Sequence, residues 1–197
     1  MVQDQVIFID ADKKNLLKFA RKILQEALKD DSLRNRFDWA QKFYPTFSAK
    51  ANLPCALFVT IKDGKTLRGC VGTVLAELPL LSAAAKMVLQ SAFSDPRFPP
   101  LTIPEFSRVQ LEISILSPMK KINNLNEIIP FEHGVYIRKG TQAGLFLPQV
   151  WETLPREEDF LRELCFSKAR LPLEALKDAK TEIYVFTAQV IEENDCA

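Results

Sequence analysis

The segment from Leu67 to Gly72 reads LRGCVG and combines a nucleophilic side chain with a cation. On an extended strand, Arg68 and Cys70 are two residues apart and point to the same face. A guanidinium close to a thiol favours the thiolate and lowers the thiol pKa. Gly69 and Gly72 lack side chains, so a ligand can approach the backbone closely. The segment therefore predicts a nucleophilic site, with Cys70 as the candidate catalytic residue and Arg68, Gly69 and Gly72 as candidate binding residues.

A structural role for the same segment is the alternative interpretation. Free cysteine is among the most buried residue types. Glycine within a strand often marks only a β-bulge. Residue types and spacing alone leave both interpretations of Cys70 open.

His133 is the only histidine in the chain, so a cysteine–histidine pair would join it to Cys70 or to Cys165. We keep His133 as a candidate catalytic residue. No orienting carboxylate can be assigned to it, and it precedes Gly134 at an expected strand start. The favoured interpretation of His133 is therefore a structural residue at the end of a loop.

Three further charged residues are candidate binding residues. Asp95 and Arg97 flank Pro96, as in an ordinary turn, and we favour a side-chain lock on a proline-rich loop. The functional interpretation is that Arg97 supplies an anion-binding fork. Glu112 lies in the middle of an expected strand, where it could be a general base, a partner of Arg68 or Arg97, or simply a solvated carboxylate.

The motifs for metals and nucleotide cofactors are missing from the sequence. Cys55, Cys70, Cys165 and Cys196 form no C-x-x-C pair, so a zinc site of cysteine and histidine is not expected. The chain has no P-loop, no G-x-G-x-x-G fingerprint and no H-E-x-x-H helix. The GCVG stretch resembles the G-x-x-G loop that clamps nucleic acid, but a hairpin is the wrong setting for that loop. We predict no metal and no cofactor.

Composition is that of an ordinary globular protein. The chain has 197 residues, of which 47% are hydrophobic and 26% charged, and its net charge is +1. This charge gives no support for a nucleic-acid partner or an acidic membrane, although a local basic patch can hide in a neutral total. The N-terminus does not read as a signal peptide, and no apolar stretch approaches the roughly 20 residues that span a bilayer. We predict a cytoplasmic protein with free thiols and no membrane contact.

Hydrophobic periodicity predicts three amphipathic helices, at 15–29, 80–93 and 157–169. Alternation and β-forming residues predict a hairpin of 56–62 and 66–74 that turns at Asp63-Gly64, a strand at 109–116, a second hairpin within 133–148, and a strand at 181–192. Residues 30–53 are expected to be loops or short turns. Residues 94–106 hold four prolines and are expected to be irregular.

Hairpins outnumber β-α-β units, which favours an α+β fold with antiparallel sheets flanked by helices. The two hairpins lie far apart in sequence, and the last strand can rejoin the first sheet. We therefore predict a larger discontinuous domain at 1–118 and 173–197, with a smaller inserted domain at 119–172.

Several blocks of the sequence, in order, resemble the AMMECR-domain family, which is named for a human chromosomal-region protein linked to Alport syndrome with elliptocytosis. LRGCVG differs from the family signature L-R-G-C-I-G only at Val71. The other matching blocks are Phe58-Val59-Thr60, the DPRFPP segment at 95–100, the strand at 111–118 that ends in LSP, His133-Gly134, and GLFLPQV at 144–150. The resemblance spans residues 12–193.

The resemblance implies a fold, a site and partners. Family members are two-layer α+β proteins with a large and a small domain, and the cysteine motif lies near the cleft between them. The microbial name, AmmeMemoRadiSam system protein A, implies association with a Memo-type protein and a radical-SAM enzyme. The family's molecular activity is not established. We expect a thiol-dependent enzyme or enzyme accessory with a small-molecule cleft around LRGCVG; the alternative is a non-catalytic module that binds protein or nucleic acid there.

Overall fold

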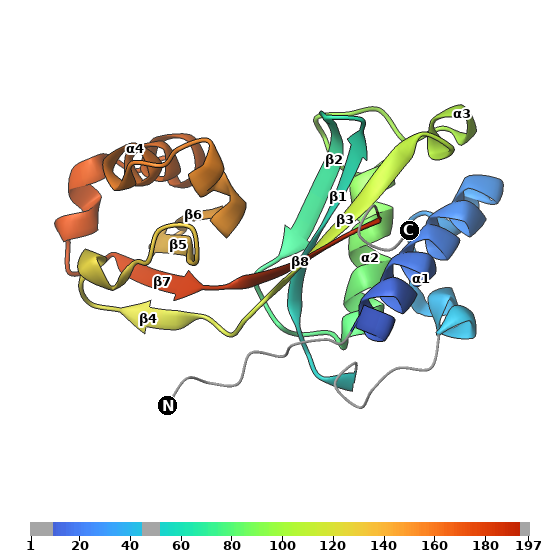
Figure 1. Cartoon of the computed structure of the whole chain (residues 1–197), viewed down its shortest axis with the longest axis horizontal. Coiled ribbons are helices and arrows are strands. Elements are labelled where there is room, and N and C mark those ends of the chain that lie inside the picture. Colours follow the sequence, from blue (N-terminus) through green and yellow to red (C-terminus); the bar gives the residue numbers. More distant parts are fainter. Residues whose placement is uncertain (1–9, 45–51, 194–197) are drawn as a thin grey trace. The chain divides into compact units, whose positions relative to one another are not determined.

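The computed structural model describes residues 10–44 and 52–193 (Figure 1). The described residues divide into two compact units, one within 1–116 and 189–197 and the other within 117–188. Each unit contains one four-stranded sheet. The predicted α+β fold with antiparallel sheets is confirmed.

The second compact unit spans residues 117–188, whereas the predicted insertion spans residues 119–172. The expected single strand at 181–192 is two strands, β7 (Glu182–Phe186) and β8 (Ala188–Glu192). β7 pairs with β4 (Lys120–Ile122) and β5 (Gly134–Lys139), so it belongs to the smaller unit. Only β8 returns to the larger sheet.

The sheet of the larger unit has the order β2-β1-β3-β8. β1 (Ala56–Asp63) is antiparallel to both β2 (Thr66–Thr73) and β3 (Val109–Leu116). Two helices, α1 (Asp10–Lys29) and α2 (Leu80–Phe93), cover one face of this sheet (Figure 1).

The core of the larger unit lies between these helices and the sheet. Alternate residues of β1, namely Leu57, Val59 and Ile61, are fully buried and point to the helices, as the period of two in a strand requires. Leu111 and Ile113 of β3 continue the same apolar layer. The residues between them therefore point to the opposite face of the sheet.

The first hairpin turns one residue later than predicted. Asp63 pairs with Thr66, so the two central residues are Gly64 and Lys65 rather than Asp63 and Gly64. Gly64 has a φ of 59°, whereas Lys65 is not among the described residues with positive φ. A glycine with positive φ at the first central position is the pattern of a type II′ turn.

Short helical turns lie in two of the connections of the larger unit, between α1 and β1 and between α2 and β3. They are η1 (Asp31–Leu33), η2 (Asp38–Phe43) and α3 (Ile103–Phe106). α3 corrects the expectation that 94–106 is wholly irregular. Thr102 and Glu105 form a capping box, and a proline in the first turn costs the helix no hydrogen bond.

The smaller unit has a sheet of order β4-β7-β5-β6, in which β6 spans Gln142–Phe146. The expected helix at 157–169 consists of α4 (Glu157–Glu163) and a π-helical turn, η6 (Leu164–Ala169). Trp151 and Phe160 stack at the centre of the core, with ring centroids 3.8 Å apart. The remaining elements are η4 (Leu125–Glu127), η5 (Pro148–Glu152) and η7 (Leu173–Lys177).

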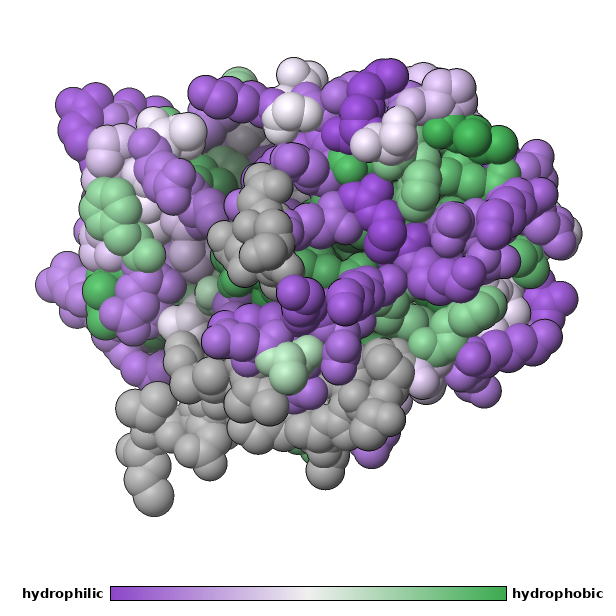
Figure 2. Space-filling view, turned by 45° about the vertical axis from the view of Figure 1, so that its right-hand side comes forward, coloured by the Kyte–Doolittle hydropathy of each residue, from purple (hydrophilic) through white to green (hydrophobic). Residues whose placement is uncertain are grey.

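The face shown in Figure 2 is mainly hydrophilic, with hydrophobic residues in smaller patches between hydrophilic ones. None of the helices in the described part of the chain has the length and apolar character that crossing a bilayer requires.

Gly69 of β2 fixes how closely α2 packs on the sheet. A Cβ atom at this position would lie 2.1 Å from the backbone oxygen of Ser91 in α2. We predict that Gly69→Ala lowers the free energy of unfolding by about 2 kcal/mol, because a backbone atom of a helix cannot rotate aside. Urea unfolding measures the change, with Thr66→Ala, an exposed position of the same strand, as the control. A loss no larger than the control's would contradict this account of the glycine.

Candidate functional site

The register of three strands brings Cys70, Thr60 and Glu112 together. Thr60 of β1 lies directly opposite Cys70 of β2 on one side and opposite Glu112 of β3 on the other. Directly opposed residues of antiparallel strands share a face. These three residues, here called the polar row, therefore lie on the face that α1 and α2 do not cover.

Cys70 is half-buried, and its sulfur accepts a hydrogen bond from Thr60 Oγ1 at 3.4 Å. Burial raises the pKa of the Cys70 thiol above its ordinary value, and the carboxylates of Glu112 and Asp95 raise it further. The Thr60 hydroxyl and the Arg97 guanidinium act in the opposite direction without cancelling the rise. The thiol is protonated at neutral pH, so nucleophilic chemistry would need a base.

Arg68 does not assist the thiol as its spacing predicted. Gly69 pairs with Ile61 and Leu67 with Lys62, so Arg68 is the extra residue of a β-bulge. Its Nε donates to Glu105 Oε1 at 2.7 Å, and its Nη2 donates to the carbonyl oxygen of Pro99 at 2.9 Å. The prediction that Arg68 lowers the Cys70 pKa is wrong, because its guanidinium binds Glu105 and the carbonyl oxygen of Pro99 instead.

Asp95 and Arg97 clamp the backbone of Cys70. The Cys70 N–H donates to Asp95 Oδ2 at 2.8 Å, and Arg97 Nη2 donates to the Cys70 carbonyl oxygen at 3.0 Å. The two side chains are also ion-paired at 2.6 Å. Arg97 holds the pKa of buried Asp95 down to about 2. This geometry supports the side-chain lock, and it makes Arg97 the guanidinium that acts on the thiol.

The space beside both glycines of the motif is filled by protein atoms. Gly69 lies against α2, as described above. A Cβ atom at Gly72 would lie 2.3 Å from the ring of Phe58. In this structure the two glycines allow close internal packing, and neither leaves room for a ligand to approach the backbone.

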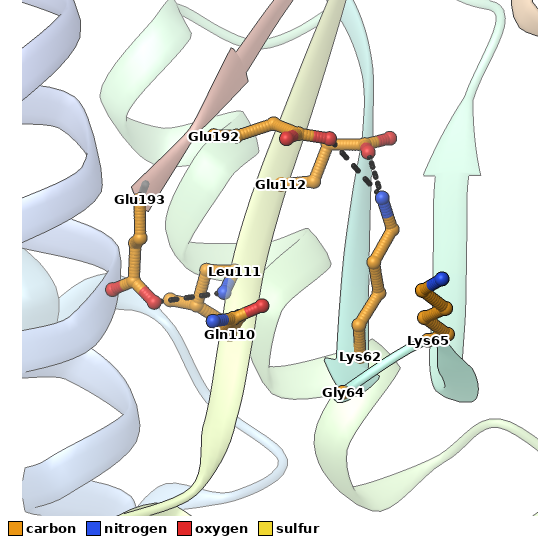
Figure 3. A pocket seen from close by; sticks show the side chains of 8 residues that line it. All are labelled: Lys62, Gly64, Lys65, Gln110, Leu111, Glu112, Glu192 and Glu193. Atoms are coloured by element: carbon orange, nitrogen blue, oxygen red, sulfur yellow. Dashed lines mark hydrogen bonds and ion pairs between the residues drawn. The ribbon is translucent and has the colours of Figure 1, made fainter. Parts of the chain in front are cut away.

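Glu112 is paired with Lys62 and Glu192, and not with Arg68 or Arg97 as the sequence suggested. Lys62 Nζ donates to Glu112 Oε2 at 2.5 Å and to Glu192 Oε1 at 3.1 Å. Figure 3 shows the two carboxyl groups facing one another beside this ammonium group. Burial, followed by the hydrogen bond with Glu192, raises the pKa of Glu112. The hydrogen bond with Glu112, followed by the one with Lys62, lowers the pKa of Glu192. The two carboxyls therefore titrate as an interacting pair, in which Glu112 holds its proton to higher pH than Glu192 does.

Sequence reasoning missed Lys62 and Glu192. Residues 62, 112 and 192 are far apart in the chain and belong to no common motif. Only the strand order β1-β3-β8 brings them together. The available signal was weak: each is a charged residue within or at the end of an expected strand.

A pocket of about 380 Å³ opens at this end of the sheet (Figure 3). It is lined by residues of the first hairpin, β3 and the end of β8, namely Lys62, Gly64, Lys65, Gln110, Leu111, Glu112, Glu192 and Glu193. Glu112 thus belongs both to the polar row and to the wall of the pocket.

His133 belongs to the smaller unit. Its Nδ1 accepts a hydrogen bond from the Ile129 N–H at 3.1 Å, and its carbonyl oxygen accepts one from Trp151 Nε1 at 2.8 Å. These contacts support the structural interpretation of a loop-end residue. Cys165, in the same unit, is buried, and burial raises the pKa of its thiol.

The residues that the structure describes hold no cluster of three or more histidine, cysteine, aspartate or glutamate side chains placed to bind a metal. The carboxyl groups at the pocket are engaged with Lys62 and Arg21.

Comparison with known proteins gives consistent matches. The family model AMMECR1 matches residues 17–191. A protein of Nanoarchaeum equitans is 38% identical over 194 residues, covering 91% of this chain and 99% of its own length. A protein of Aquifex aeolicus is 39% identical over 151 residues, covering 71% and 75%. The crystal structure of an uncharacterised protein from Pyrococcus horikoshii superposes with a TM-score of 0.82 at 31% identity, covering 94% of this chain and 93% of that one.

The Asp95 clamp has a testable pH dependence. The pKa of Asp95 in the folded state is about 2, below the ordinary 3.8. Its contribution to stability is therefore complete above about pH 4 and is lost as the pH falls through about pH 2. We predict that Asp95→Asn lowers the free energy of unfolding by about 2 kcal/mol at neutral pH, and that the deficit shrinks in acid. Urea unfolding across this range measures it.

The matched control is Glu77→Gln, which removes an exposed carboxylate of the same unit. It should leave both the stability and its pH dependence close to those of the unmodified chain. An Asp95→Asn deficit that stays constant down to the acid limit would contradict the clamp as the source of the effect.

The protonation state of Cys70 can be measured by alkylation. We predict that the rate of its reaction with iodoacetamide rises with an inflection at higher pH than that of N-acetylcysteine, because burial raises the Cys70 pKa. Glu112→Gln should move the inflection down, because it removes a negative charge that opposes the thiolate. Peptide mass spectrometry assigns the modified cysteine. An inflection below that of N-acetylcysteine would show that the thiol is activated instead.

Proposed function

The chain belongs to the AMMECR1 family, and we propose that it is an enzyme in which Cys70 attacks the acyl group of a small substrate. The observation that carries the proposal is the polar row, which places a thiol, a hydroxyl and a carboxyl group side by side across one sheet. A nucleophile, a proton carrier and an adjoining pocket are the parts that acyl transfer requires.

The proton must travel some distance in this scheme. Cys70 and Glu112 are separated by one strand, so their Cα atoms are about 10 Å apart, given the usual spacing between strands. Direct transfer between the two side chains is excluded at that distance. Thr60 lies between them and contacts the sulfur. If its hydroxyl turns, Thr60 can accept the thiol proton and donate its own hydrogen toward Glu112.

The proposed reaction conserves atoms and charge. The sulfur lone pair forms a bond to the acyl carbon, the carbonyl π pair moves to oxygen, and the thiol proton passes through Thr60 to the Glu112–Glu192 pair. The oxyanion then reforms the carbonyl, and the bond to the leaving group breaks as the carboxyl pair returns the proton to it. Water releases the acyl group as a carboxylic acid and restores the thiol. A carboxyl group whose pKa is raised, as that of Glu112 is, suits both directions of transfer better than an ordinary carboxylate does.

Two observations favour a second candidate function, a binding module without covalent chemistry. The thiol pKa is raised, and protein atoms fill the space at both glycines of the motif. The same face would then dock a protein or nucleic acid, and the Memo-type and radical-SAM proteins that the microbial family name implies would be the first partners to examine.

Acylation distinguishes the two candidates. We predict that p-nitrophenyl acetate gives a burst of p-nitrophenol with the acetyl group on Cys70, located by peptide mass spectrometry. Cys70→Ala should abolish the burst. Glu112→Gln should slow it by about 100-fold or more, the usual cost of losing a positioned proton carrier.

The control is Cys55→Ala, because burial raises the pKa of the Cys55 thiol to about 12. This variant should keep the full burst. A burst that survives Cys70→Ala, or acetylation of a different residue, would rule out Cys70 as the nucleophile and leave the binding module as the better description.

A further inference from the structure

The sheet of the smaller unit has a hydrophobic core on one face only. Alternate residues of its strands, such as Val135, Ile137 and Val185, are buried in that core. Every described helical segment of the unit contributes to the same core, through Leu125 of η4, Trp151 of η5, Phe160 of α4, Leu164 of η6 and Ala175 of η7. The strand residues between the buried ones point to the opposite face, because successive side chains of a strand alternate. We call this opposite face the outer face; it consists of Lys121, Tyr136, Arg138, Ala143, Leu145, Glu182 and Tyr184.

Two tyrosines occupy the centre of the outer face. Tyr184 of β7 lies directly opposite Tyr136 of β5, and these are the two inner strands of the order β4-β7-β5-β6. Their ring centroids are 5.9 Å apart. Both side chains are partly exposed, and neither belongs to a hydrophobic core of the described residues. Packing of the cores therefore does not account for this pair.

A cation lies beside each tyrosine. Lys121 of β4 is opposite Tyr184, on the side away from Tyr136. Arg138 follows Tyr136 by two residues on the same strand and so shares its face. The side chains of Lys121 and Arg138 are 52% and 50% exposed. Glu182 is ion-paired with both and is the one carboxylate of the outer face, which therefore carries two positive charges and one negative charge.

We propose that the outer face binds single-stranded RNA, with one unpaired base stacked on each tyrosine. Every base has a π-face, so stacking on an aromatic ring needs no particular sequence. Aromatic side chains on neighbouring strands of a four-stranded sheet, with the helices on the other face, are a recurring platform for unpaired bases. This site lies in the smaller unit, and the proposal does not rest on the acyl transfer proposed for Cys70.

The charges of the outer face match the backbone of such a strand. Lys121 and Arg138 are placed beside the rings, where the phosphates that flank two stacked bases would lie. The carboxylate of Glu182 repels phosphate, but it can accept a hydrogen bond from a ribose 2′-hydroxyl, the group by which proteins distinguish RNA from DNA. With two cations and one carboxylate, we expect binding that weakens only gradually as the salt concentration rises.

Fluorine NMR tests the location of the site. The chain has three tyrosines, so labelling with 3-fluorotyrosine gives three signals. Oligouridylate of about 12 nucleotides, long enough to span several stacked bases, should shift the signals of Tyr136 and Tyr184. The signal of Tyr44, in the larger unit, should stay in place. Unmoved signals of Tyr136 and Tyr184, or a shift of Tyr44 as large as theirs, would overturn the proposal.

Affinities measured by fluorescence anisotropy test the stacking. Tyr136→Leu and Tyr184→Leu should each weaken the binding of labelled oligouridylate by about fivefold or more, the usual loss when one base gives up its aromatic partner. Tyr44→Leu is the matched control and should keep the affinity of the unmodified chain. Duplex RNA of the same length should bind more weakly, because its bases are already stacked on one another. An affinity that survives both substitutions, or that is equal for the duplex, would contradict stacking on the tyrosines.

Oligodeoxyuridylate tests the assignment of Glu182, because it differs from oligouridylate only in lacking the 2′-hydroxyls. The unmodified chain should bind oligouridylate about twofold to tenfold more tightly, the usual range for one hydrogen bond. Glu182→Leu should remove this preference and tighten the binding of oligodeoxyuridylate, since both cations lose their carboxylate partner. Equal binding of the two strands by the unmodified chain would overturn the choice of RNA.

Discussion

The pairing of β1 with β2 on one side and β3 on the other is the constraint on which the proposed site depends. β1 is the strand through which Cys70, Thr60 and Glu112 are aligned. Its apolar residues Val59 and Ile61 fix the register, because a slip by one residue would turn them away from the helices and bring Thr60 into the core. The free energy that sets the register is hydrophobic, whereas the residues that it positions are polar.

Burying the carboxyl group of Glu112 on β3, between β1 and β8, has an electrostatic cost. A buried carboxylate loses its hydration, and the attraction of a single cation often fails to repay that loss. The structure reduces the cost in two ways. Lys62 pairs with the carboxylate from the next strand, and the hydrogen bond with Glu192 raises the pKa of Glu112, which favours its neutral form. Glu112 is one of the few charged residues that are buried in the described part of the chain.

The sequence predicted the elements well and the relations between them less well. Periodicity identified the two long helices and the first hairpin, because those patterns depend on local burial. It misplaced the turn by one residue, and it offered a bulge at the glycines of the motif only as an alternative, since a bulge depends on the strand opposite. Cys70, Asp95, Arg97 and Glu112 were found by residue type, but their partners were not. The order of the strands in the sheet brings Lys62 and Glu192 to Glu112. The spacing of these residues in the sequence does not reveal that order.

The bulge and the clamp together explain why the motif carries its arginine. Because Arg68 is the extra residue in β2, its guanidinium is directed to Glu105 and Pro99, where it ties the start of α3 to the strand. Arg97, from the intervening loop, then reaches the backbone of Cys70. The loop at 94–106 is thus fastened to β2 at two points. The thiol receives a hydrogen bond from Thr60 and interacts with the Arg97 guanidinium, so it lies between the polar row and the clamp that fixes its backbone.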